Sequence, residues 1–159
     1  MKKLLYAIGL GGIIYGAYRY YQIQSDILYY SKIKMSGLKI KQATAELIIF
    51  EVKLKVTNNS EFAFTLMKYN LGIYINNNKV SDVKNSNVNE VLEGNGSTSE
   101  ISFDVKFNPK QFGLLDLFRQ VLSSLKKTVV GVRGDMKIKK GILNIDIPLD
   151  LTYKVDDFV

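Results

Sequence analysis

The chain has 159 residues, of which 47% are hydrophobic and 23% are charged, and its formal net charge is +7. This composition is typical of a globular protein with room for one domain and an appendage, and it excludes wholesale disorder. The sequence contains no histidine and no cysteine. The commonest general base, the commonest transition-metal ligand and all thiol chemistry are therefore missing. We expect a protein that is not an enzyme, with no catalytic residue, no metal site and no cofactor.

The chain begins with an apolar run, MKKLLYAIGLGGIIYGAYRYYQI. Its uncharged part, residues 4–18, would span about 22 Å as a helix, whereas the hydrocarbon core of a bilayer is about 30 Å thick. The run reaches that length only if it extends to residue 23 and Arg19 reaches the headgroups. We predict an apolar helix over residues 1–23 that serves as a membrane anchor or as an assembly helix. The candidate interfacial residues are Tyr15, Tyr18, Arg19, Tyr20 and Tyr21.

Two other readings of this run concern cleavage and helix packing. A signal peptide would need small residues in a small-x-small pattern before its cleavage site, and the run offers no convincing one. Gly9, Gly12 and Gly16 recur at positions i, i+3 and i+7, so they share one face of a helix. The pair Gly12 and Gly16 forms a G-x-x-x-G motif, which lets another backbone approach closely. Whether lipid, a sister helix or another protein faces these glycines is left open.

The segment that follows, residues 24–36, contains no proline or glycine. We predict a stalk or a bent connector there, because the composition of a flexible linker is missing. Basic residues flank the apolar run on both sides, so the positive-inside rule nearly balances. A short N-terminal tail usually stays inside, and we therefore expect the C-terminal domain to be exported.

From residue 37 the hydrophobic period changes to two, which predicts antiparallel strands. A helix interrupts them after residue 108, where Asn108 can cap it and Pro109 suits its first position. Pro148 predicts that the last strand is an edge strand or carries a bulge. About seven strands with one covering helix indicate a β-sandwich over residues 37–159. The predicted strands lie within residues 45–59, 68–77, 79–84, 97–109, 129–140 and 142–155, and the stripe of the helix comprises Phe112, Leu115, Phe118, Leu122 and Leu125, followed by Lys126 and Lys127.

Several short motifs in this order resemble the late embryogenesis abundant type 2 family, also called the WHy-domain family. A long strand runs into Asn58-Asn59-Ser60, and Glu93-Gly94-Asn95-Gly96-Ser97 precedes another alternating strand. The resemblance covers about residues 36–155. The other matching stretches are residues 37–40, residues 62–74 and the final IPLDLTY strand.

This resemblance implies a fibronectin/immunoglobulin-like antiparallel β-sandwich without enzymatic activity and with frequent N-terminal membrane anchoring. It also implies protection of proteins or membranes during dehydration, or binding close to a membrane. Our first hypothesis is a membrane-anchored sandwich that acts through protein or lipid contacts. The alternative is a structural subunit of a large assembly, such as a phage virion or a secretion machine, with the N-terminal helix buried in the particle or its membrane.

The remaining polar residues indicate surfaces. Asp146 and Asp150 lie about 13 Å apart along one strand, too far to form an acid–base pair or a shared metal site on that strand. Lys137, Lys139 and Lys140 form a basic strand that could contact lipid headgroups or an acidic partner. We expect membrane lipid and a protein partner or a homo-oligomer, with neither nucleic acid nor a small-molecule substrate.

Overall fold

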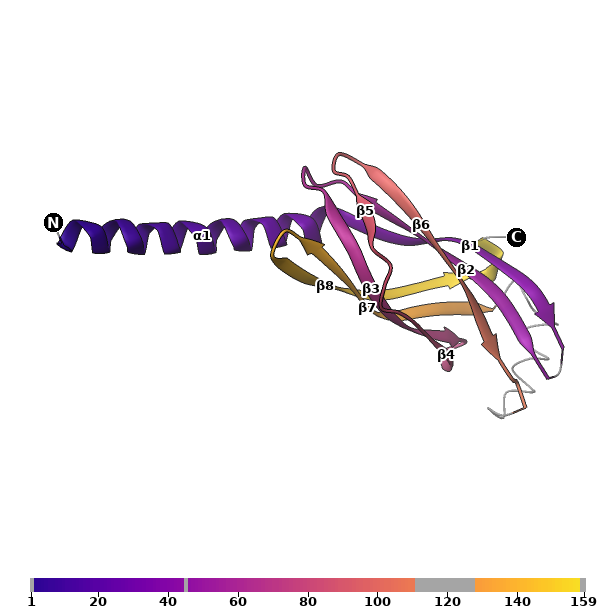
Figure 1. Cartoon of the computed structure of the whole chain (residues 1–159). Helices are drawn as coiled ribbons and strands as arrows, with labels where there is room; N and C mark the ends of the chain where they lie inside the picture. The colour runs from indigo at the N-terminus through magenta and orange to yellow at the C-terminus, as the bar shows by residue number, and fades with distance from the viewer. Residues whose placement is uncertain (1, 45, 111–127, 158–159) are drawn as a thin grey trace.

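The computed structural model describes residues 2–44, 46–110 and 128–157. One long helix, α1 (Lys2–Tyr30), leads directly into a body of strands and extends away from one end of that body (Figure 1). The strands are β1 (Ser31–Ala43), β2 (Ile48–Asn58), β3 (Phe64–Ile75), β4 (Asn78–Asn85), β5 (Glu90–Leu92), β6 (Ser97–Phe107), β7 (Val129–Lys140) and β8 (Leu143–Lys154), and a 3-10 turn, η2 (Val155–Asp157), follows them.

Two antiparallel sheets enclose one hydrophobic core and together form a β-sandwich. The first, sheet A, has the order β1-β2-β6, and the second, sheet B, has the order β4-β3-β7-β8 with β5 paired to β3. Alternate residues of each strand point into the space between the sheets, as a two-residue period requires. Val52 and Leu54 of sheet A and Leu71 and Ile73 of sheet B are all 0% exposed. The expectation of a mainly β, antiparallel fold is confirmed, whereas the fibronectin/immunoglobulin-like type stays a prediction.

The last strand shows why its proline is tolerated. β8 ends the order of sheet B, so one of its edges has no neighbouring strand in that sheet. Pro148 lies opposite Asp135 of β7, and the pairing passes through this point without a register shift. Because proline has no N–H to donate, an edge position costs the ladder little. Of the two sequence-based alternatives, the structure therefore selects the edge strand over the bulge.

The N-terminal part of the body differs from the expectation. α1 continues to Tyr30 and β1 begins at Ser31, so residues 24–36 form the end of the helix and the start of a strand. The alternating pattern of β1 was hard to read because its pairing with β2 shifts between Met35 and Gly37 and again between Ile40 and Gln42. Each shift exchanges the inward and outward residues and breaks the period of two.

The helix expected after Asn108 falls mostly outside the described residues, which end at residue 110 and resume at residue 128. At its predicted start, the Asn108 side chain accepts a hydrogen bond from the backbone N–H of Lys110 at 2.9 Å. This is the contact that an N-cap residue makes. The helix itself and its stripe, from Phe112 to Leu125, stay a prediction.

The last turns of α1 are attached to the body. Ile27 is 0% exposed and belongs to the core, and Ile23 packs against it. The backbone N–H of Asn59 donates to the carbonyl oxygen of Tyr30 at 3.2 Å, just where the helix ends. This bond satisfies one of the carbonyl groups that a helix terminus leaves without an intrahelical partner.

A buried asparagine joins three segments beside that junction. The Asn58 amide nitrogen donates to the carbonyl oxygens of Phe62 at 2.7 Å, Glu93 at 2.9 Å and Leu92 at 3.3 Å. Its side-chain oxygen accepts from the backbone N–H of Ser60 at 3.1 Å and from the Ser60 hydroxyl at 2.6 Å. Asn58 is 0% exposed, so each of these partners would lose a bond that water cannot replace.

The turn that faces Asn58 is held just as closely. A Cβ atom on Gly94 would lie 2.7 Å from the carbonyl oxygen of Ser60, a distance that real Cβ atoms essentially never show. The backbone N–H of Asn95 donates to Ser60 at 2.8 Å, and that of Gly96 donates to Asn58 at 2.7 Å. The two motifs that carried the family resemblance are therefore in direct contact. We infer that the residues that match the family at these positions are there because they hold the fold together.

Replacing Asn58 with alanine should lower the free energy of unfolding by about 3 kcal/mol, because buried carbonyl groups lose their donor. Urea denaturation of the full chain measures this change. Asn59→Ala is the matched control, since the Asn59 side chain is exposed, and it should stay within about 0.5 kcal/mol of the original protein. Equal losses in the two variants would show that Asn58 is not the joining residue.

Candidate functional site

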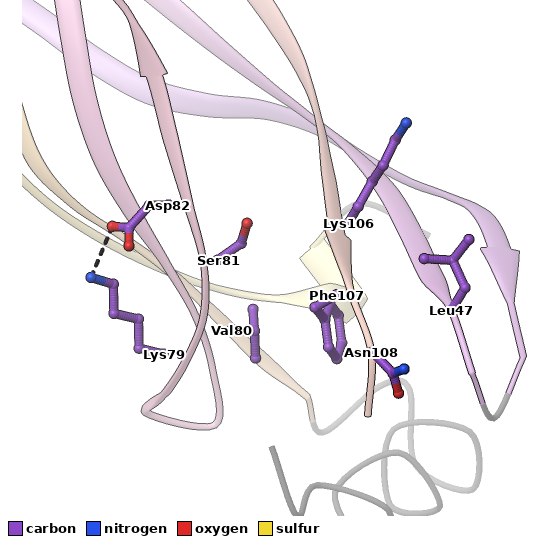
Figure 2. Close-up of a pocket in the computed structure, with 8 residues that line it drawn as sticks. All are labelled: Leu47, Lys79, Val80, Ser81, Asp82, Lys106, Phe107 and Asn108. Carbon is purple, nitrogen blue, oxygen red and sulfur yellow. Dashed lines mark ion pairs between the residues drawn. The ribbon is translucent and has the colours of Figure 1, made fainter. Parts of the chain in front are cut away.

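A cleft of about 520 Å³ opens between β4 and β6 (Figure 2). The two strands approach each other at the end of the body away from α1 (Figure 1). Figure 2 shows Val80 and Phe107 in the space between these two strands, with Leu47 on the far side of β6. Val80 is 2% exposed and Phe107 is 6% exposed, so the floor of the cleft is apolar and continuous with the core. Its full lining consists of Leu47, Lys79, Val80, Ser81, Asp82, Lys106, Phe107 and Asn108.

The polar rim of this cleft carries an ion pair on β4. The Lys79 ammonium and the Asp82 carboxylate are 2.8 Å apart on the outer side of β4 (Figure 2). The hydrogen bond from Lys79 to Asp82 raises the pKa of Lys79 above its ordinary value, which keeps the amine protonated and unsuited to act as a base. An apolar floor with a charged rim is suited to binding the apolar part of a ligand or partner.

The outer face of sheet A carries a connected set of ion pairs. Lys41 lies 2.6 Å from Asp104 and 3.5 Å from Glu51, and the Ser102 hydroxyl donates to Glu51 at 2.9 Å. That hydrogen bond, together with the charge of Lys41, lowers the pKa of Glu51. The hydrogen bond to Asp104 raises the pKa of Lys41. These groups are solvent-exposed, so the set is a surface ladder with modest effects on stability.

A second pair of acid and base continues the same face toward α1. Lys53 and Glu100 are 3.0 Å apart, and the Ser36 hydroxyl donates to Glu100 at 3.1 Å. The hydrogen bond from Lys53 lowers the pKa of Glu100, and the bond to Glu100 raises the pKa of Lys53. The acidic side chains in the middle of sheet A thus each have a cation or a hydroxyl as a partner.

The carboxylates considered as catalytic pairs lie apart in separate ion pairs. Asp146 is 3.2 Å from Lys137, and Asp150 is 3.1 Å from Arg133. Across residues 2–44, 46–110 and 128–157, no group of three His, Cys, Asp or Glu side chains could hold a metal ion. The structure therefore separates these two carboxylates and pairs each of them with a cation.

The basic strand expected at residues 137–140 is divided among different contacts. Lys137 pairs with Asp146. Lys140 lies over the ring of Phe62, with its nitrogen 4.4 Å from the ring centroid, and donates to the carbonyl oxygen of Ala63 at 3.4 Å. Lys139 is exposed. Two of these three lysines thus have partners within the protein, and contact of this strand with lipid or an acidic partner stays a prediction.

The interfacial candidates on α1 are exposed. Tyr15, Tyr18, Tyr20 and Tyr21 have between 46% and 73% of their surface accessible to solvent, and Arg19 donates to Gln22 at 3.3 Å. A Cβ atom on Gly16 would meet nothing within 4 Å. Gly9 and Gly12 belong to α1, but their surroundings lie outside what the structure describes. What faces these three glycines stays a prediction.

The expectation of a membrane-spanning helix is not supported. Within the described part of the chain, α1 included, no helix has both the length and the apolar content that crossing a membrane requires.

The cleft between β4 and β6 was missed by sequence reasoning. It depends on the approach of two strands from different sheets, and no local pattern shows that approach. The one local signal was the pair of successive strands predicted within residues 68–77 and 79–84, the second of which carries Lys79, Val80 and Asp82 and pairs with β3.

Comparison with known proteins supplies the remaining context. A family model described as late embryogenesis abundant protein matches residues 53–152, well over half of the chain. No curated protein sequence matches. Among solved structures, an Arabidopsis thaliana protein, AT1g01470, aligns with a TM-score of 0.54 at 13% identity, over 77% of this chain and 80% of its own.

Two further solved structures align at similar levels. A Bordetella pertussis protein assigned as ApaA has a TM-score of 0.52 at 12% identity, over 77% of this chain and 90% of its own. A protein assigned to the late embryogenesis abundant group has a TM-score of 0.49 at 11% identity, over 78% of this chain and 70% of its own. At such identities the likeness to AT1g01470 and to the Bordetella pertussis protein concerns the fold alone.

The ion pairs of sheet A predict how stability depends on pH. The pKa values of Glu51 and Glu100 are lowered in the folded chain from 4.5. Their contribution is therefore present above pH 4.5 and is lost as the pH falls through the lower, folded values. Urea denaturation should give a free energy of unfolding that decreases below that pH. The double variant Glu51→Gln, Glu100→Gln should show a weaker decrease, and parallel curves for the two proteins would contradict this assignment.

Proposed function

Since this chain belongs to the late embryogenesis abundant protein family, we propose that it is a stress-protective protein that acts through contacts of its β-sandwich beside a membrane. Membership of the family points to a stress-related role without catalysis. The finer assignment to the WHy-domain branch is part of this proposal. The apolar cleft between β4 and β6 and the charged face of sheet A supply binding surfaces for such contacts.

The observation that carries the membrane part of the proposal is the exposure of α1. Its last turns are attached to the body through Ile23 and Ile27. The preceding turns expose tyrosines to solvent, and Tyr21 is 73% exposed. Residues 4–18 contain no charge. Apolar side chains gain free energy when they leave water, and tyrosine is enriched where membrane meets water.

Association through α1 does not require that the helix cross the membrane. Helices can lie in the plane of the interface, with apolar side chains inserted among the headgroups. A protein attached in this way keeps its sandwich at the membrane surface. There the sandwich can contact lipid or neighbouring proteins as water is withdrawn.

Removing residues 2–21 should move the protein from the membrane fraction to the soluble fraction, because the exposed apolar turns are lost. The truncated chain keeps Ile23 and Ile27, so its fold can be checked by circular dichroism and urea denaturation. Vesicle flotation and cell fractionation measure the distribution. Identical distributions of the full and truncated chains would contradict attachment through α1. A full-length protein that sediments as a large particle in the absence of lipid would instead support an assembly subunit.

The protective role has its own test. A dehydration-sensitive enzyme dried with the full-length protein should retain more activity than the same enzyme dried with an equal mass of an unrelated soluble protein. Activity after rehydration is the readout. Equal recovery in both samples would argue against protection of proteins and leave the attachment through α1 unaffected.

A further inference from the structure

We propose that one side of α1 and the adjoining end of sheet A form a single docking surface that lies flat on a bilayer containing anionic lipid. This inference rests on the proposed attachment to a membrane and adds the orientation of the protein and the class of lipid. Two sets of residues carry it: an aromatic stripe on α1 and a lysine cluster on β1 and β2.

The aromatic stripe consists of Tyr18, Tyr21, Leu28 and Tyr29. With 3.6 residues per turn, these positions lie on one side of α1, opposite Ile23 and Ile27. Their exposed fractions are 61%, 73%, 38% and 79%, whereas Ile27 is 0% exposed. A shallow groove lined by Tyr21, Gln24, Ser25, Leu28 and Tyr29 runs along this side of the helix.

The aromatic stripe and the outer face of sheet A point the same way. α1 passes into β1 with no intervening loop, so it continues the layer of sheet A (Figure 1). Ile27 points inward to the core, on the side where α1 meets β8 of sheet B. The opposite side of the helix therefore faces away from sheet B, as the outer face of sheet A does.

The lysine cluster consists of Lys32, Lys34 and Lys55, at the end of sheet A nearest α1. Lys34 lies directly opposite Lys55 in the register of β1 and β2, and Lys32 lies opposite Thr57. Like charges directly opposite each other in a sheet are destabilising. Within the described part of the chain, none of the three lysines forms an ion pair.

The nearest acid, Glu100, offsets one lysine of this cluster in part, because its carboxylate also attracts Lys55. Glu100 lies opposite Lys55 on β6, but it is bonded to Lys53 and Ser36. Farther along the face, Lys41 is paired with Glu51 and Asp104. The positive charge of this face is therefore compensated away from the helix and only partly compensated next to it, where Lys32 and Lys34 form no ion pair with the described residues. An anionic surface supplies the missing partner.

A bilayer with anionic headgroups is complementary to both the aromatic stripe and the lysine cluster. Tyrosine and leucine side chains insert at the boundary between headgroups and acyl chains, and lysines beside them are attracted to anionic lipid. Asp26 is the single acidic residue of α1. It lies at the edge of the aromatic stripe, about 60° of rotation from Tyr29, and is half-buried.

Vesicle binding by the full-length protein tests the lipid class. We expect tighter binding to phosphatidylcholine vesicles that contain 30% phosphatidylserine, at roughly one lipid in three, than to pure phosphatidylcholine, with a difference that shrinks as salt is added. The triple variant Lys32→Gln, Lys34→Gln, Lys55→Gln should weaken binding to the anionic vesicles about 100-fold, on the basis of roughly fivefold for each lysine.

A matched control separates the lysine cluster from net charge. Lys68→Gln, Lys84→Gln, Lys154→Gln removes the same charge from exposed positions of sheet B, and it should leave binding nearly unchanged. An equal loss in both triple variants would overturn the inference, because overall charge would then explain the binding. Binding of single-stranded RNA as tight as that of anionic vesicles, with the same dependence on the three lysines, would also overturn it.

Orientation has a direct reporter because the chain contains no tryptophan. Tyr21→Trp places one on the aromatic stripe, and Thr152→Trp places one on the outer face of sheet B as a control. With anionic vesicles, we expect a blue shift and quenching by lipids brominated near the headgroups for Tyr21→Trp alone. Equal spectra in the two variants would overturn the flat orientation.

The outcomes for this inference and for the proposed function are distinguishable. Failure of the unmodified protein to bind either type of vesicle would overturn both. Binding that is equal for neutral and anionic vesicles and insensitive to the three lysine substitutions would overturn the docking surface alone. Attachment of the protein to membranes through α1 would then still stand.

Discussion

The buried amide of Asn58 is the interaction on which the arrangement of this protein depends. It ends β2, holds the carbonyl groups of the segments before β3 and after β5, and lies next to Asn59, whose backbone bonds to the last residue of α1. One side chain thus fixes the end of sheet A, the entry to β6 and the exit of the helix. Because these bonds are shielded from water, their geometry is constrained far more tightly than that of the ion pairs on the surface.

The sequence predicted the sheets well wherever a strand keeps one face inward over its whole length. β2 and β6 are such strands, and their alternating residues Val52, Leu54 and Val105 form the core. β1 was missed because two register shifts disturb its alternation. The joining role of Asn58 could not be read either, although its motif was recognised, because the pattern does not show that residues 92–96 lie against it. Pairing between distant segments is set by packing, which a local pattern does not contain.

The candidate surfaces show the same difference between what a local pattern contains and what packing decides. The tyrosines of α1 could be listed from the sequence, but the side they present to solvent follows from the burial of Ile27. The basic strand at residues 137–140 was evident as a run of lysines, yet two of its members are engaged by Asp146 and Phe62. The lysines of β1 and β2 looked like an ordinary solvated face. The role that we propose for them rests on the pairing of their acidic neighbours, which depends on three strands together.

The position of Pro148 bears on how the protein behaves when it is crowded. An edge strand offers a row of unpaired backbone groups to any other strand that approaches, and this is a common route to aggregation. Pro148 interrupts that row in β8, and the register shifts and lysines of β1 do the same at one edge of sheet A. A cell that loses water concentrates its proteins and brings such edges together. These edges are built to resist joining, so the chain can remain dispersed under the conditions in which a stress protein must work.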